Sequence, residues 1–137
     1  MNSETVKKNI ESALELVYRV DSYLIRHNAH EQSISARLAF HLQHLFPEWD
    51  VDVEYNRQGE SCDPKKDLEE QNRKPDVIIH KRGSVGPNLV IMLVKCEWNT
   101  QDRSNDESVL SSLKERHNYE NAFLIEIKKS NFDIEEK

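Results

Sequence analysis

Glycine, proline and cysteine are scarce in this sequence. Three glycines and four prolines among 137 residues argue against a disordered chain of low complexity. The two cysteines, Cys62 and Cys96, lie far apart and fit no Cys-x-x-Cys spacing. This cysteine usage predicts a reduced protein of the cytoplasm.

Long hydrophobic runs are also missing. The longest apolar run, residues 89–94, is far too short to cross a bilayer. The first residues are polar and are typical of a helix rather than a signal peptide. We therefore expect no membrane partner. No internal repeat is visible.

Positive charge is in deficit, with 19 Lys and Arg against 25 Asp and Glu, a formal net charge of -6. That balance disfavours non-specific binding to nucleic acid, although a local basic patch would still permit it. The candidate patch is Lys65, Lys66, Arg73, Lys74, Lys81 and Arg82. Acidic residues interleave with these cations and weaken the prediction.

Two helices are predicted first. Apolar residues recur at helical spacing over residues 3–27, with Ser3 as a plausible N-cap. A second helix is predicted over residues 30–46, and Pro47 ends it.

The pattern then changes to strands. Residues 49–56 alternate between apolar and mostly acidic side chains, which predicts a half-buried strand. Residues 57–74 carry no apolar periodicity and predict a long loop. Residues 77–80 and 89–96 predict two further strands, the second covered on both faces. A short helix over residues 108–116 and a strand over residues 122–127 complete the pattern.

The element order α-α-β-β-β-α-β predicts one α/β domain with a mixed central sheet flanked by helices. Residues 1–29 form its N-terminal helix, residues 30–127 its core and residues 128–137 a charged tail.

Asp76 and Lys95 are the first candidates for chemistry. Period-two alternation, with a turn between their strands, places both side chains on the same side of adjacent strands. A carboxylate binds a hard divalent cation, which activates water and screens a phosphate. A lysine nearby can stabilise the developing negative charge.

The segments VDVEYNR, PDVIIHKRG and NLVIMLVK together resemble the PD-(D/E)xK nuclease superfamily over roughly residues 30–127. The resemblance implies a restriction-endonuclease-like core that cleaves DNA with Mg²⁺. It implies that Asp76 is the metal-binding aspartate and that Lys95 is the family's lysine. Glu31 is similar in placement to a helix glutamate that some members use.

Leu93 departs from that pattern, because an acidic residue is expected two places before the lysine. Glu54 and Glu31 are the candidates to replace it, with Glu54 as a second metal ligand beside Asp76. Glu97 lies four residues from position 93, roughly 13 Å along a strand, which is too far. Glu126 and Lys128 form an intact Glu-x-Lys but are better explained as an exposed strand face.

Three functions remain open. The first is a degenerate, catalytically impaired nuclease-like protein that acts by binding in DNA metabolism or defence, with Asp76 and Lys95 joined in an ion pair. The second is an active Mg²⁺-dependent DNA nuclease with a relocated carboxylate. The third is an oligomeric scaffold or protein-binding module. If Leu93 is the lesion, Leu93→Glu is expected to restore metal binding and cleavage.

Other polar residues have simpler interpretations. The pairs His41 and His44, and His27 and His30, are expected at polar helix edges rather than at a metal. Asp50 and Asp52 are expected on a solvated strand face. Cys96 is expected to be a small core residue.

Overall fold

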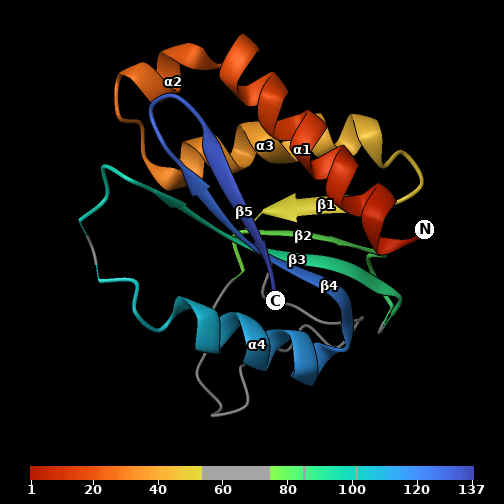
Figure 1. Cartoon of the computed structure of the whole chain (residues 1–137). Coiled ribbons are helices and arrows are strands. Elements are labelled where there is room, and N and C mark those ends of the chain that lie inside the picture. The colour runs from red at the N-terminus through yellow and green to blue at the C-terminus, as the bar shows by residue number, and fades with distance from the viewer. Residues whose placement is uncertain (54–74, 85, 101) are drawn as a thin grey trace.

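The computed structural model describes residues 1–53, 75–84, 86–100 and 102–137. Within these ranges the chain is an α/β fold built on a five-stranded mixed sheet, which confirms the predicted class. Helices α1, α2 and α3 cover one face of the sheet, and helix α4 covers the other (Figure 1). None of the helices in this part of the chain is long and apolar enough to span a membrane.

The elements follow one another with short connections where both ends are described. Their bounds are α1 Ser3–Val20, α2 Ser22–Arg26, α3 Glu31–Leu45, β1 Asp50–Val53, β2 Val77–His80, β3 Asn88–Cys96, α4 Asp106–His117, β4 Tyr119–Ile127 and β5 Phe132–Glu136. In the sheet the strands lie in the order β1-β2-β3-β4-β5.

Strand β3 is the centre of the sheet. It runs antiparallel to β2 and parallel to β4, and a parallel neighbour requires a crossover connection, which helix α4 provides. Every residue of β3 is buried except Lys95. Burial on both faces explains why this strand is a continuous apolar run rather than an alternating one.

Alternation along β2 and β3 divides the apolar side chains between two cores. Val77, Ile79, Val90, Met92 and Val94 belong to the larger core with helices α1 and α3. The smaller core contains Ile78, Ile91, Leu93, Val109, Leu110, Leu113, Tyr119 and Ala122, so it lies between the sheet and α4.

The N-terminal helix was predicted to be continuous within residues 1–29, but in the structure it is interrupted. It is interrupted at Asp21, whose carboxylate accepts hydrogen bonds from Arg37 Nε and lies 2.8 Å from His41 Nε2. These contacts tie the break to helix α3. Asn2, rather than Ser3, caps α1 by accepting a hydrogen bond from the Thr5 N–H at 2.8 Å.

Within the predicted charged tail, residues 132–136 form a strand that was not predicted, β5, which is antiparallel to β4. Phe132 and Ile134 pack against the larger core, whereas the residues that alternate with them, Asp133 and Glu135, are charged. The segment therefore has a period-two pattern that its high charge hides. Strand β4 likewise starts earlier than predicted, at Tyr119, directly after Asn118 in the left-handed conformation.

Candidate functional site

Asp76 lies immediately before β2 and is bonded to β3. Its N–H donates to the Met92 carbonyl at 3.0 Å, and its Oδ2 accepts the Val94 N–H at 2.6 Å. Burial raises the pKa of this carboxyl to about 6, against the opposing effects of the Val94 N–H and Arg103. A carboxyl with such a pKa changes its charge near neutral pH.

Glu31, the first residue of α3, contacts the same strand. Its Oε2 accepts the Cys96 N–H at 2.8 Å, and its Oε1 accepts a hydrogen bond from Arg103 Nη1 at 2.6 Å. Glu31 and Asp76 thus bind the backbone N–H groups of β3 two residues apart. The tertiary structure brings together two of the residues that the resemblance singled out.

Arg103 was not predicted as a site residue, yet it lies between the acidic groups. Besides Glu31, its Nε donates to Asp106 Oδ2 at 2.6 Å, and its Nη2 lies 3.4 Å from the Val94 carbonyl oxygen. Its side chain is only 16% exposed. Burial alone would lower the pKa of Arg103, but Glu31 and Asp106 raise it, so the guanidinium stays charged.

Glu31, Asp76, Arg103 and Asp106 form what we call the Arg103 cluster. The only sequence signal for its two unpredicted members is an arginine three residues before an aspartate, shortly before the predicted helix. That spacing indicates a local ion pair. It does not reveal the contact with Glu31, which lies 72 residues away.

Lys95 is the one residue of β3 that is not fully buried. No ion pair joins it to Asp76, although both residues are described, so the ion pair expected for an inactive site is absent. The pKa of Glu135 is lowered, mainly by Lys137, and Lys95 contributes to the same effect. Lys95 therefore lies within electrostatic range of strand β5.

Leu93 is 1% exposed and belongs to the core beneath α4. Ile78 and Ile91 from the sheet, and Leu110 and Leu113 from α4, belong to the same cluster. An acidic side chain at position 93 would enter an apolar environment. At the position where the resemblance predicts an acid, the structure therefore has a core residue.

Two adjoining hollows open beside the start of α3. The smaller, of about 250 Å³, is lined by His30, Glu31, Gln32, Ser35, Val53, Asp76 and Asn99. The larger, of about 470 Å³, shares His30, Glu31 and Asn99 with it and extends towards Trp98. Ser35 is 2% exposed, and its Oγ has no hydrogen-bond partner among the described residues.

The remaining candidates are engaged elsewhere or lie outside the described residues. Glu54, Lys65, Lys66, Arg73 and Lys74 fall within residues 54–74, outside the described ranges. Glu97 Oε2 accepts the Lys129 N–H at 2.7 Å, and Lys128 pairs with Asp133.

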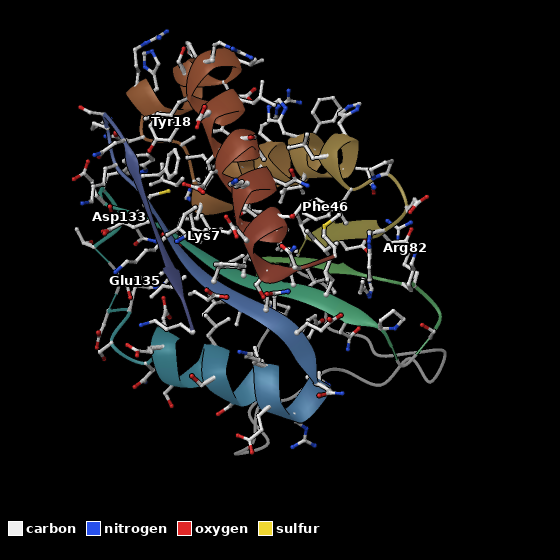
Figure 2. All side chains as sticks on the ribbon, turned by 45° about the vertical axis from the view of Figure 1, so that its right-hand side comes forward. Lys7, Tyr18, Phe46, Arg82, Asp133 and Glu135 are labelled. Atoms are coloured by element: carbon white, nitrogen blue, oxygen red, sulfur yellow. The ribbon has the colours of Figure 1, made fainter. Side chains whose placement is uncertain are left out.

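The first strand pair holds a separate charged group. His80 Nε2 lies 2.7 Å from Asp52 Oδ2, and Arg82 binds both oxygens of the same carboxylate. Burial would raise the pKa of Asp52, but the hydrogen bonds from His80 and Arg82 lower it to about 2. Arg82, labelled in Figure 2, lies at the turn beside β1 and β2. The acidic face of β1 is thus partly exposed, as predicted for Asp50 and Asp52, and it also carries ion pairs with Arg82.

The cluster as folded does not fit the Mg²⁺ that the resemblance implies. A hard divalent cation needs several available oxygen ligands, but both oxygens of Glu31 already accept hydrogen bonds, and Arg103 places a positive charge among the carboxylates. Within the described ranges no three histidine, cysteine or acidic side chains are arranged to hold a metal ion.

Comparison with known proteins adds no family or fold assignment. No protein-family model matches the chain, and neither the curated proteins nor the solved structures include a significant match to it.

Proposed function

We propose that this protein acts by binding, through a nuclease-like core whose catalysis is impaired, and that DNA is its ligand. One observation carries the proposal: the Arg103 guanidinium bridges Glu31 and Asp106 beside Asp76. In a metal-dependent nuclease these carboxylates would have to be available to a divalent cation. In this protein the carboxylates of Glu31 and Asp106 neutralise the Arg103 side chain instead.

The choice of DNA rests on the three ordered segments that resemble the PD-(D/E)xK superfamily. The formal net charge of -6 opposes binding by charge alone, so binding must come from a local surface. We therefore expect modest affinity for duplex DNA that falls as salt concentration rises.

Two assays on the purified chain test the proposal. Supercoiled plasmid with Mg²⁺ or Mn²⁺ should remain intact, and fluorescence anisotropy with a labelled duplex should report binding at low salt. Brisk nicking that is lost in Asp76→Ala would refute impaired catalysis. Absence of binding to DNA at low salt would refute the choice of ligand.

An active Mg²⁺-dependent nuclease is the second candidate. One observation favours it: Glu31 and Asp76 bond to β3 two residues apart, so Glu31 is close to where a relocated carboxylate would be needed. In that case Glu31→Gln and Asp76→Asn should each abolish nicking. Glu107→Gln, which changes an exposed acid of α4, is the matched control and should leave nicking unchanged.

A further inference from the structure

The smaller of the two hollows beside α3 contains a polar group that lacks a partner. Ser35 lines this hollow and is only 2% exposed, and its hydroxyl has no hydrogen-bond partner among the described residues. A buried hydroxyl without a partner is unfavourable, whereas a polar ligand in the hollow would supply the missing bond. The hydroxyl of Ser35 therefore indicates that the hollow receives such a ligand.

Asp76 provides a second unused polar atom on the wall of the same hollow. Its Oδ2 accepts the Val94 N–H, but in the part of the chain that the structure describes its Oδ1 accepts no hydrogen bond and no cation pairs with it. Arg103 already pairs with both Glu31 and Asp106. Three carboxyls thus share one guanidinium, so the surroundings of the hollow carry a net negative charge and favour a positively charged ligand.

The acceptors in this hollow suit an ammonium group better than a metal ion or an anion. A primary ammonium has three N–H donors and no acceptor, so a carboxylate oxygen, a hydroxyl and an amide carbonyl satisfy it. Asn99 carries an amide on the same wall. A hard divalent cation instead requires several free oxygen ligands, and both oxygens of Glu31 are occupied. An anion would be repelled by the net negative charge.

The larger hollow gives the ligand room for an alkyl stem. It adjoins the smaller one through the residues that they share, and it adds Ala29 and Trp98 to the wall. Lys129 Nζ already lies over the Trp98 ring, 4.9 Å from the ring centroid, so a second positive charge is disfavoured at this end. The charged head is therefore directed towards Asp76, and the apolar stem towards Ala29 and Trp98.

We propose that the hollow beside α3 binds a primary alkylammonium, with Asp76 Oδ1 and Ser35 Oγ as acceptors for its N–H donors. The ligand is either a free amine or the lysine side chain of another protein, because both present the same head and stem. The inference goes beyond the proposed function and stands without it, since it concerns a small organic cation and not DNA.

The test is a titration of the isotope-labelled chain with n-butylammonium chloride at constant ionic strength, followed by amide NMR. Signals of residues that line the hollow, such as Gln32, Ser35 and Asn99, should shift and saturate. The dissociation constant should be about 1 mM, the range expected for so small a ligand. Tetramethylammonium chloride carries the same charge without an N–H donor, and it should give no saturable shift.

Two variants locate the binding. Asp76→Asn keeps the shape of the side chain but removes its charge, and it should weaken binding at least about tenfold. Ser35→Ala removes the unpartnered hydroxyl and leaves no other group unsatisfied, so it should weaken binding about threefold without destabilising the free protein. Asp133→Asn, which changes an exposed acid of β5 paired with Lys128, is the matched control and should leave the affinity unchanged.

Nα-acetyl-lysine N-methylamide, titrated in the same way, distinguishes the two sources of the ammonium. Tighter binding than that of n-butylammonium identifies a lysine side chain as the ligand, and weaker binding identifies a free amine; both results support the site. Absence of saturable shifts with either amine would overturn the proposal. So would an equal response to tetramethylammonium, or an undiminished affinity in Asp76→Asn or in Ser35→Ala. None of these outcomes depends on DNA binding.

Discussion

At the scale of single residues, Asp76 is held in an unfavourable ionisation state. Burial raises its pKa from 3.8 to about 6, so at neutral pH the folded protein carries a largely buried negative charge. Its hydrogen bond from the Val94 N–H offsets only part of that cost. Such a group destabilises the folded state most when it is fully ionised.

Asp76→Asn should therefore stabilise the protein at pH 8, by about 1–3 kcal/mol. Because the folded pKa is raised, the protonated acid favours folding below pH 3.8, and this contribution is lost as pH rises through about 6. The difference between variant and wild type should consequently shrink as pH falls from 8 towards 4. Urea denaturation across that range measures it. Glu136→Gln, at an exposed position, is the control, and equal gains in both variants would contradict the explanation.

Leu93 shows what the core requires at the position where the resemblance to nucleases predicts an acid. Leu93→Glu should destabilise the fold by several kcal/mol, because it buries a carboxylate among Ile78, Ile91 and the residues of α4. We expect no gain in nicking from the surviving folded fraction. Leu93→Met, which conserves volume, should cost less than about 1.5 kcal/mol. Urea denaturation compares the two, and a stable Leu93→Glu variant that cleaves plasmid would reverse this prediction.

At the scale of elements, strands β1 and β2 are joined by charge as well as by backbone bonds. Asp52 of β1 binds His80 of β2 and Arg82 just after it. Asp52→Asn should cost about 1–2 kcal/mol at pH 7, where the Asp52 carboxyl is ionised.

This cost has a defined pH window. The pKa of Asp52 is lowered to about 2 in the folded protein, so its contribution is present above pH 3.8 and is lost as pH falls through about 2. The stability difference between Asp52→Asn and the wild type should be constant from pH 7 to 5 and vanish near pH 2. Guanidinium denaturation gives the values. A difference that persists at pH 2 would show that packing, not ionisation, is responsible.

Strand β5 is anchored to helix α1 through Tyr18, which is labelled in Figure 2. Its hydroxyl lies 2.7 Å from the Lys128 carbonyl oxygen and accepts the Lys128 N–H at 3.1 Å. Burial raises the pKa of this phenol to about 12, so it remains a donor at any physiological pH.

Tyr18→Phe should lower stability by about 1–2 kcal/mol, because it leaves backbone groups of the β4–β5 turn without their partner. Hydrogen exchange should show faster opening of residues 128–136 than of β3. Tyr23→Phe is the control, since Tyr23 is 64% exposed and its loss should cost little. Uniform acceleration over the whole sheet would contradict an anchoring role for Tyr18.

At the scale of the whole molecule, the carboxyls of Asp76 and Asp52 have opposite effects on stability when acid protonates them. Protonation of Asp76 near pH 6 stabilises the fold, whereas protonation of Asp52 near pH 2 destabilises it. Wild-type stability should rise as pH falls from 8 to about 5 and decline below pH 4. The unfolding temperature, measured at intervals of half a pH unit, tests this prediction. A steady decline from pH 8 downwards would mean that other groups dominate.

Much of the fold was predictable because hydrophobic periodicity is a local property. The helical stripes before Pro47 and the alternation after it predicted helices α1 and α3 and strand β1, and the apolar run before Cys96 predicted a central strand. What local patterns missed was long-range compensation. Asp21 ends α1 through partners on α3, and charge on β5 hides the two apolar residues that join the core.

The candidate site was likewise predictable from the sequence only in part. Asp76 was marked by a Pro-Asp motif in the sequence, and Glu31 by its placement near the start of the second predicted helix. Only the tertiary structure decided that Arg103 would lie between Glu31 and Asp106, and that Leu93 would pack beneath α4. The physical reason is that a residue type determines which bonds a side chain can make, whereas the identity of its partner depends on which distant segments the folded chain brings within about 3 Å.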